Sequence, residues 1–213
     1  MHQQDLTLEI GISRSTLLLK RLIDAAAAAT GLIVLSPLLI LTALVIRLDS
    51  RGSVIFAQIR AGLGGRPFRM YKFRTMVVRA ESMLEDVVAL DALREPVFKL
   101  RNDPRVTRIG RIIRRTSLDE LPQLVNVLRG DMSLVGPRPE QVELVERYTR
   151  EERIRLAVKP GMTGPMQVFG RGQLTFEERL ALEREYVENL SLGRDLRILA
   201  LTLPAVIAGD GAF

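Results

Sequence analysis

An uncharged apolar run near the N-terminus constrains the fold of this chain more than any other feature. Residues 25–46 contain no charged side chain, and a straight helix of that length would cross the hydrocarbon core of a bilayer. The run begins too late for a removable signal peptide and lacks a small-residue cleavage site. Three structures remain open: a membrane-spanning helix, a buried core helix, and a hairpin that enters and leaves the membrane by one face.

The centre and the flanks of this run favour the hairpin. Ser36 and Pro37 stand at its centre, where proline removes a backbone hydrogen bond and bends the helix, so that each half is too short to span. Positive charge is normally held on the cytoplasmic side of a membrane. The basic residues that flank the two ends of the run are Arg14, Lys20, Arg21, Arg47 and Arg51. Both ends are therefore expected in the cytoplasm, although a kinked spanning helix stays an alternative because such helices tolerate proline.

The composition excludes several classes of active site. The chain has no cysteine and its single histidine is His2, so disulfides, thiolate or histidine-rich metal sites and Ser-His catalysis are excluded. Any catalytic metal should then be a hard ion such as magnesium. Most of the 31 basic residues are arginines, which suit phosphate binding, although a GC-rich genome would give the same bias. Nucleic-acid binding is disfavoured, because aromatic residues make up only 5% and no base-reading motif is present.

Beyond residue 50 the patterns predict an α+β fold that is mainly helical. Residues 54–60 and 68–76 are predicted as a small β-hairpin, with Lys72 and Arg74 on one face of the second strand. Residues 77–93 have the apolar stripe of an amphipathic helix. Four further helices are expected. The first covers residues 108–115 after a cap at Thr107, and the second ends at Gly130. The third runs from the capping pair Thr175 and Glu178 toward Asn189, and the fourth contains Pro204. The first and last of these could lie at a membrane interface or pack on the domain.

Two adjacent carboxylates, Asp119 and Glu120, follow a run of cations. Ser117 with Glu120 fits the capping-box pattern of a helix start. Pro122 argues against it, because the proline would fall where an amide must donate to the preceding turn. A start at Leu118 or Asp119 removes the conflict and places Asp119 at the positive end of a helix, which keeps a carboxylate ionised. Such a carboxylate could cap the helix or attack an electrophile.

A stiff turn carries a second candidate group. Arg138 lies between Pro137 and Pro139, which lower the entropy lost in holding its guanidinium in place. Residues 159–168 are predicted as another turn cluster. Together these features suggest an enzyme that acts on a phosphorylated substrate, where magnesium and arginines neutralise a diphosphate while one carboxylate attacks phosphorus and the other holds the ion.

Residues 98–140, together with the motifs YKFRTM at 71–76 and PGMTG at 160–164, closely resemble the monotopic phosphoglycosyl transferases, the bacterial sugar transferase family. The resemblance covers roughly residues 20–203. It implies an enzyme that moves a sugar 1-phosphate from a UDP-sugar to undecaprenyl phosphate and releases UMP. It also implies ping-pong chemistry through a phosphosugar-aspartyl intermediate, at the start of bacterial glycoconjugate assembly such as exopolysaccharide, O-antigen, capsule or glycoprotein synthesis.

The resemblance also implies roles for individual residues. Asp119 would be the nucleophile and Glu120 its partner, with magnesium held by this pair. Arg138, flanked by Pro137 and Pro139, would bind substrate phosphates together with Arg114. Support for these groups would come from Lys72 and Arg74.

For topology, Ser36 and Pro37 match the helix-breaking pair of the family, which favours the re-entrant hairpin. We therefore expect a monotopic protein at the cytoplasmic face of the bacterial inner membrane, in contact with its lipid, with a membrane segment over residues 1–50 and a catalytic domain over 51–213. The minimal form of the family is expected, because the extra N-terminal membrane helices of larger relatives are lacking. Pro165 and Phe169 depart from the family pattern, which leaves the donor sugar open. The sequence also leaves open whether the protein is a monomer or a homodimer.

Overall fold

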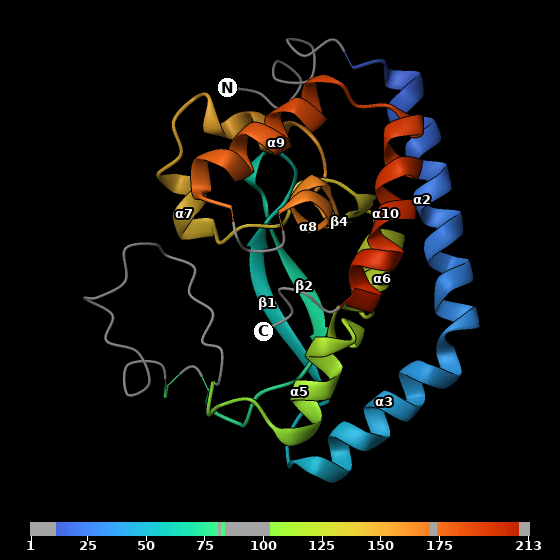
Figure 1. The fold of residues 1–213 in the computed structure, drawn as a ribbon, viewed down its shortest axis with the longest axis vertical. Coiled ribbons are helices and arrows are strands. Elements are labelled where there is room, and N and C mark those ends of the chain that lie inside the picture. The colour runs from blue at the N-terminus through green and yellow to red at the C-terminus, as the bar shows by residue number, and fades with distance from the viewer. Residues whose placement is uncertain (1–11, 81, 84–102, 171–173, 209–213) are drawn as a thin grey trace.

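The computed structural model describes residues 12–80, 82–83, 103–170 and 174–208 (Figure 1). Its elements in chain order are α2 (Arg14–Val34), α3 (Ser36–Asp49), β1 (Ile55–Ala61), η1 (Leu63–Gly65), β2 (Pro67–Phe73), α5 (Arg108–Arg115), η3 (Leu118–Glu120), α6 (Gln123–Arg129), β3 (Ser133–Val135), α7 (Val142–Glu146), η4 (Glu152–Ala157), β4 (Gly161–Thr163), α8 (Pro165–Phe169), α9 (Phe176–Glu188) and α10 (Leu192–Ala208). Helices dominate and the sheets are small, which confirms the α+β architecture expected from the sequence.

The apolar run forms the bent helix pair α2 and α3, which makes up one long edge of the molecule (Figure 1). The two helices meet at an angle of 61°. At the break, the Ser36 hydroxyl donates to the carbonyl of Ile33 at 2.8 Å, and Pro37 lies in the first turn of α3, where its missing N–H costs nothing. Within the described residues no single helix is long and apolar enough to cross a membrane, whereas the bent pair taken together passes on length and composition. The helix break expected at Ser36-Pro37 is confirmed.

Only one face of this helix pair is covered by the rest of the protein. Lys20, Asp24 and Ala28, spaced one helical turn apart on α2, are buried, and Ala28 packs in a core cluster with Leu124 and Val127 of α6. The rest of the surface of the pair exposes a series of large apolar side chains. These are Leu18, Leu19, Leu22, Ile23, Ile33, Val34, Leu38, Ile40, Leu41, Leu44 and Leu48. The run is therefore not a fully buried core helix, because the described part of the chain leaves these side chains exposed.

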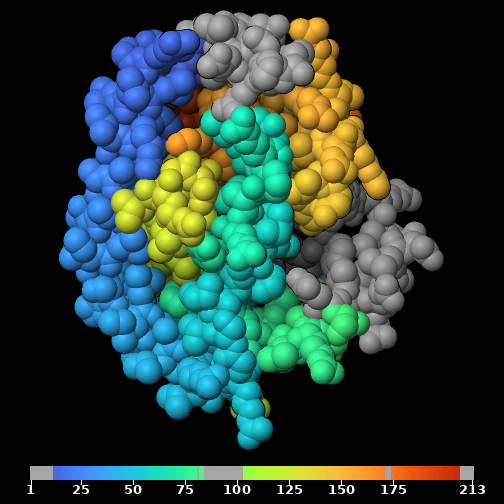
Figure 2. Space-filling model, turned by 180° about the vertical axis from the view of Figure 1, so that it is seen from behind, coloured from blue at the N-terminus to red at the C-terminus, as the bar shows by residue number. Residues whose placement is uncertain are grey.

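The β-hairpin forms as expected and is attached to α6 by one buried side chain. Strands β1 and β2 pair antiparallel with Gln58 opposite Met70, and the hairpin lies at the surface of the molecule seen from behind (Figure 2). The side chain of Asn126, which has no exposed surface, accepts from the Tyr71 N–H at 3.0 Å and donates to the Arg69 carbonyl at 2.6 Å. These bonds fix the register of β2 against the helix that follows the acidic pair.

A second, parallel pair of strands holds the other half of the molecule. Val135 of β3 pairs with Thr163 of β4, and a core cluster around Val135, Tyr186 and Ile198 lies between this pair and helices α9 and α10. The prediction of turns throughout residues 159–168 was therefore wrong. The sequence pattern of a short strand next to glycines is the same as that of a turn, and only the pairing with β3 decides between them.

Most helix ends lie where local sequence signals place them. Thr107 caps α5 by accepting from the Gly110 N–H at 2.9 Å, Thr175 and Glu178 form a capping box, and Gly130 ends α6 with a φ of 90°. Helix α10 contains Pro204, as expected. The helix predicted over residues 77–93 lies mostly outside the described residues, and the part that is described, 77–80 and 82–83, is turn or irregular structure.

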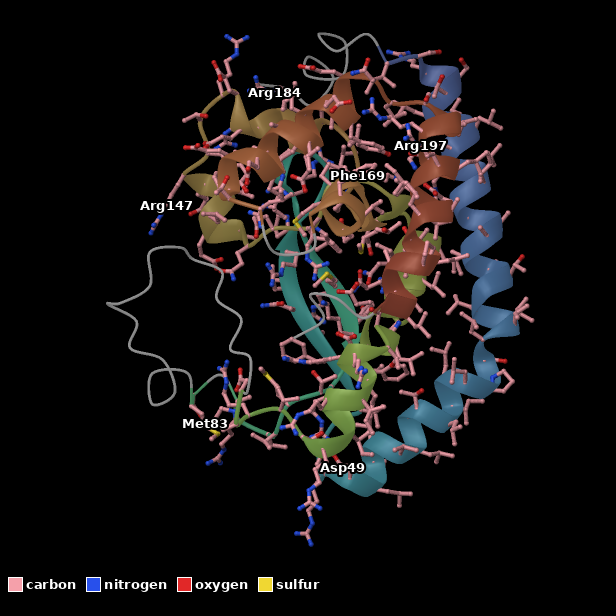
Figure 3. All side chains as sticks on the ribbon, in the orientation of Figure 1. Asp49, Met83, Arg147, Phe169, Arg184 and Arg197 are labelled. Carbon is pink, nitrogen blue, oxygen red and sulfur yellow. The ribbon has the colours of Figure 1, made fainter. Side chains whose placement is uncertain are left out.

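The basic helix α5 packs on the domain by part of its apolar face. Ile113 is buried in a cluster with Ile46 and Phe73, while Ile112 remains exposed. Nearby, α3 ends at Asp49, at the bottom of the molecule in Figure 3. The α5 end of the body therefore adjoins the C-terminal half of the helix pair.

Candidate active site

The acidic pair lies in a single 3-10 turn, η3, between α5 and α6. Ser117 adopts a left-handed backbone conformation with a φ of 56° and its side chain makes no capping bond. The capping-box alternative for Ser117 with Glu120 is therefore wrong, and no side-chain cap bond from either carboxylate forms within the described residues. The physical reason is the left-handed backbone of Ser117, which takes its side chain out of capping geometry, while Pro122 stands at the N-cap of α6.

Glu120 is held by two cations from distant parts of the chain. Its Oε1 accepts from Lys72 Nζ of β2 at 2.9 Å and from Arg138 Nη2 at 3.0 Å. Burial by itself would raise the pKa of Glu120, but the charges and hydrogen bonds of Lys72 and Arg138 lower it well below the ordinary value. Glu120 is therefore ionised and fixed in place at neutral pH.

Asp119, the neighbouring carboxylate, has no such clamp. Within the described part of the chain its carboxylate makes no hydrogen bond or ion pair. Burial, followed by repulsion from Glu120, raises the pKa of Asp119 to about 6, against the opposing charges of Lys72, Arg114 and Arg138. One carboxylate of the pair is thus committed to cations, while the other is ionised near neutrality and free to react.

Arg114 is fixed on the same side of the turn by close packing of α5 on the end of β2. Its Nε donates to the Thr75 hydroxyl at 2.8 Å. At Gly110 an added Cβ would come within 2.0 Å of the Thr75 carbonyl oxygen, so only glycine allows this approach. Burial lowers the pKa of Arg114 while Asp119 raises it, but a guanidinium stays charged under all ordinary conditions.

Two groups of predicted site residues have other contacts in this structure. Arg74 donates to the carbonyls of Ser50 and Arg51 at 2.9 and 2.5 Å, so it ties β2 to the end of α3 rather than lying beside the acidic pair. Pro137 and Pro139 are buried, and they hold the Arg138 turn rather than offer a surface to a ligand. Asp119, Glu120, Lys72, Arg114 and Arg138 are the predicted residues that the fold brings together.

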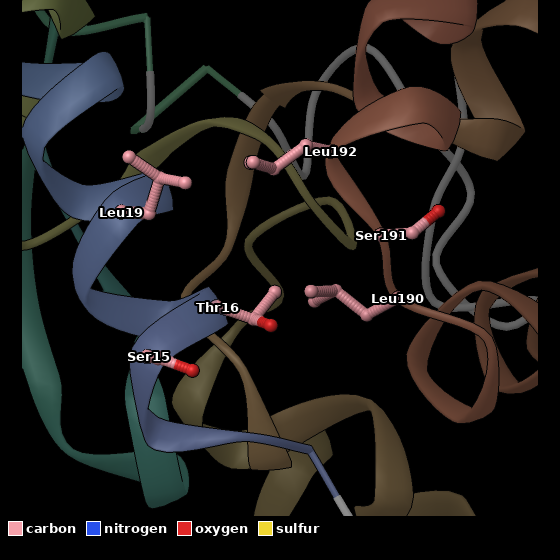
Figure 4. Close-up of a pocket in the computed structure, with 6 residues that line it drawn as sticks. All are labelled: Ser15, Thr16, Leu19, Leu190, Ser191 and Leu192. Carbon is pink, nitrogen blue, oxygen red and sulfur yellow. The ribbon is translucent and has the colours of Figure 1, made fainter.

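A cavity of about 290 Å³ lies elsewhere, between the start of α2 and the junction of α9 with α10 (Figure 4). Its lining residues are Ser15, Thr16, Leu19, Leu190, Ser191 and Leu192. None of these carries an ionisable side chain, and none belongs to the acidic pair or its cations. The cavity therefore offers no group for the chemistry predicted from the sequence.

Comparison with known proteins identifies the family of this chain. A family model described as bacterial sugar transferase matches residues 15–209. The chain belongs to the bacterial sugar transferase family. This confirms the resemblance seen in the sequence motifs, and the match includes the bent helix pair as well as the acidic turn.

Several members of the bacterial sugar transferase family are similar over most of this chain. The galactosyl transferase CpsE of Streptococcus agalactiae is 45% identical over 199 residues, which are 93% of this chain and 44% of CpsE. An undecaprenyl-phosphate galactose phosphotransferase of Salmonella typhimurium is 44% identical over 94% of this chain and 43% of its own length. The exopolysaccharide production protein ExoY of Rhizobium meliloti is 40% identical over 91% and 88%. The chain thus spans less than half the length of the first two relatives and most of the third.

The acidic pair of this chain suits a magnesium ion whose remaining ligands would be oxygens of the substrate. The contacts of Glu120 with both cations use Oε1. Within the described residues, neither Glu120 Oε2 nor the Asp119 carboxylate makes a hydrogen bond or ion pair with another side chain. Magnesium is usually bound by one or two carboxylates together with phosphates and water. The described residues contain no group of three or more acidic, histidine or cysteine side chains that could hold a metal by themselves.

Sequence reasoning missed the residues that support this site. Asn126 carried a signal, since it is a polar side chain inside the otherwise apolar middle of α6 and is fully buried. Arg155 and Glu183 carried none, because they lie far apart in sequence in segments rich in charge. Of the two positions that depart from the family pattern, Pro165 is buried at the start of α8 and Phe169 is 53% exposed at its end (Figure 3).

Proposed function

We propose that this protein transfers a sugar 1-phosphate from a UDP-sugar to undecaprenyl phosphate, with release of UMP, by a two-step mechanism. The observation that carries the proposal is the unequal pair in η3: Glu120 is held by Lys72 and Arg138, and Asp119 beside it has no ion-pair partner among the described residues and a pKa raised to about 6. The names of relatives, among them an undecaprenyl-phosphate galactose phosphotransferase, support the same class of reaction. By analogy with ExoY, the product would begin a bacterial glycoconjugate such as an exopolysaccharide.

In the first step an Asp119 carboxylate oxygen attacks the phosphorus that bears the sugar. The bond from this phosphorus to the bridging oxygen of the diphosphate breaks, and UMP leaves with that oxygen and its electron pair. Lys72, Arg114 and Arg138 offset the negative charge that would otherwise repel the attacking carboxylate. A magnesium ion, when bound at the two carboxylates, would supply further charge neutralisation to the diphosphate.

In the second step a phosphate oxygen of undecaprenyl phosphate attacks the same phosphorus. The Asp119–phosphorus bond breaks, which regenerates the carboxylate and leaves a diphosphate between lipid and sugar. The arrangement suits both steps, because Glu120 and its cations stay in place while only Asp119 changes its bonding. Since UMP leaves before the acceptor reacts, the kinetics would be ping-pong.

A lipid acceptor requires the site to face a membrane. The bent pair of α2 and α3 and the exposed leucines and isoleucines along it fit a helix hairpin that enters the lipid from one side. We therefore propose a monotopic protein at the cytoplasmic face of the bacterial inner membrane, with Arg14 and Arg51 on the same side. Burying the exposed apolar side chains in lipid would contribute about 1.5–3 kcal/mol for each one that is fully covered.

The test uses purified protein with magnesium and a panel of UDP-sugars in the absence of lipid. We expect an accepted donor to release UMP in an amount equal to that of the enzyme, and mass spectrometry of the quenched protein to find the sugar phosphate on Asp119. Asp49→Asn, which changes an exposed aspartate at the end of α3, should behave as the unaltered protein. Release of UMP only when the lipid acceptor is present, with no adduct on the protein, would refute the two-step mechanism.

A further inference from the structure

The loop that carries Arg138 is held by a buried ionic network on its far side. Arg155 of η4 has only 1% of its side chain exposed, and its Nη2 donates to the backbone carbonyl of Arg138 at 2.9 Å. Its Nη1 donates to Glu140 Oε2 at 3.1 Å and to the Tyr148 hydroxyl at 2.6 Å. The guanidinium thus joins the Arg138 backbone to groups that lie inside the domain.

Glu183 of α9 holds the other backbone polar group of Arg138, its N–H. Its side chain has no exposed surface and lies 2.7 Å from Arg155 Nη2 through Oε2. Its Oε1 accepts from the backbone N–H of Arg138 at 3.1 Å. One buried ion pair therefore binds both the N–H and the carbonyl of Arg138.

The direction of the Arg138 side chain depends on this backbone hold. A following proline restricts the preceding residue to extended conformations, and Arg138 is followed by Pro139. The start of the turn is pressed against β4, since a Cβ added at Gly161 would lie 2.1 Å from the Gly136 nitrogen. With the backbone fixed at these points, the guanidinium of Arg138 extends to Glu120 at 3.0 Å.

We propose that Arg155 and Glu183 are positioning residues that set Arg138 against Glu120, and that they act on phosphate transfer through Arg138 alone. This rests on the proposed function, because Arg138 is given its role by that reaction. In the structure neither residue makes a hydrogen bond or ion pair with Asp119 or Glu120. Since buried ion pairs often add little to stability in comparison with apolar residues of similar size, specific placement of a loop is a reason for keeping one here.

A double-mutant cycle separates positioning from a general structural role. We expect Glu183→Gln to lower kcat/KM by about 10–100-fold in the otherwise unaltered protein, the size of loss expected when a substrate-binding group is displaced by about 1 Å. In an Arg138→Ala background the same change should alter kcat/KM by less than about threefold, because the group it positions is gone. A loss of equal size in both backgrounds would overturn the proposal.

Glu185→Gln provides the matched control, since it is the same chemical change two residues along α9 at an exposed ion pair with Arg194. It should leave kcat/KM unchanged in both backgrounds. Should Glu183→Gln fail to fold, Arg155→Lys replaces it, because lysine keeps the buried charge but cannot reach both a carboxylate and the Arg138 carbonyl with the same geometry.

A second measurement does not depend on turnover and so separates this proposal from the proposed function. In nitrogen-labelled protein the side-chain N–H signal of Arg138 can be assigned by its disappearance in Arg138→Ala. Glu183→Gln should shift or broaden this signal, while Glu185→Gln should not. An unchanged Arg138 signal in folded Glu183→Gln protein would refute the positioning role even if no donor sugar were found, whereas a shifted signal without turnover would place the failure in the proposed reaction.

Discussion

Two clusters that each contain acidic and basic side chains lie close together in this fold, and their carboxylates are paired to different degrees. In the cluster on η4 and α9, Glu140 and Glu183 each lie within 3.1 Å of Arg155, and Glu140 also lies 2.9 Å from Arg179. In the cluster at η3, both cations that approach within ion-pair distance bind Glu120. In the first cluster both carboxylates have an ion-pair partner, although Glu183 Oε2 makes no hydrogen bond within the described residues, whereas in the second cluster Asp119 has no ion pair within those residues.

The two clusters also differ in how the pKa values of their groups are shifted. Burial alone would lower the pKa of Arg155, but Glu183, Tyr148 and Glu140 together raise it, so this guanidinium is locked in its charged form. At η3 burial and Glu120 raise the pKa of Asp119 to about 6. A fully paired cluster can hold a backbone in place, and a cluster with one spare carboxylate has a group available for attack. Three measurements can break or sharpen this contrast.

The largest effect is expected on turnover from loss of the spare carboxylate. Asp119→Asn should lower kcat for UMP release by about 10⁴-fold or more. An amide oxygen is a poor nucleophile, and a covalent mechanism stops when its nucleophile is lost. Glu120→Gln should cost less, since it weakens the hold on Lys72 and Arg138 without removing the attacking atom. Purified Asp119→Asn protein that turns over at a rate close to Glu120→Gln would contradict the division of roles.

The next effect is expected on stability from the fully paired cluster. Arg155→Met should lower the free energy of unfolding by about 3–5 kcal/mol, because it leaves Glu183 buried without its cation. Denaturant titration of the purified proteins in one detergent measures this loss. The comparison variant is Arg184→Gln, whose exposed pair with Glu151 should contribute less than about 1 kcal/mol. Equal losses in the two variants would show that the buried cluster adds no more to the free energy of unfolding than a surface ion pair does.

The smallest effect is a gain in stability when the spare carboxylate is neutralised. Because the pKa of Asp119 is raised to about 6 in the folded protein from an ordinary 3.8, ionisation of Asp119 destabilises the fold as the pH rises between these values. Without metal, Asp119→Asn should therefore be more stable than the unaltered protein by about 2–3 kcal/mol above pH 6 to 7, and the gain should vanish below about pH 4. Unfolding measured across this pH range in a chelator checks it, and a gain that is constant with pH would argue against a titrating Asp119.

Features that depend on a few neighbouring residues were predictable from the sequence. The caps at Thr107 and Thr175, the end of α6 at Gly130 and the bend at Ser36-Pro37 all formed as expected. In each of these, the partner of the decisive group lies within four residues, so the local sequence contains both sides of the interaction. The acidic pair was also identified, since adjacent carboxylates near arginines and a braced turn are visible as a pattern.

Local patterns misled where an unusual backbone conformation or a distant contact decides. Ser117 has the right residue type for a cap, yet its left-handed backbone serves the turn between two helices. Arg74 alternates with Lys72 on the same strand, yet it lies against the end of α3 while Lys72 reaches Glu120. Both outcomes depend on how the helices and the hairpin pack.

The sequence by itself determined the capped starts of α5 and α9, the end of α6 and the break in the apolar run, because short-range sterics and hydrogen bonds fix these features. Its motifs also showed which family the chain resembles. Only the tertiary structure decided that Lys72 and Arg138 share one oxygen of Glu120, and that Arg155 and Glu183 bind the backbone of Arg138. It also decided that Asp119 has no ion pair with any cation in the described part of the chain. Charges separated by tens of residues along the chain interact strongly only when folding removes the water between them, and no local pattern specifies which pairs will meet.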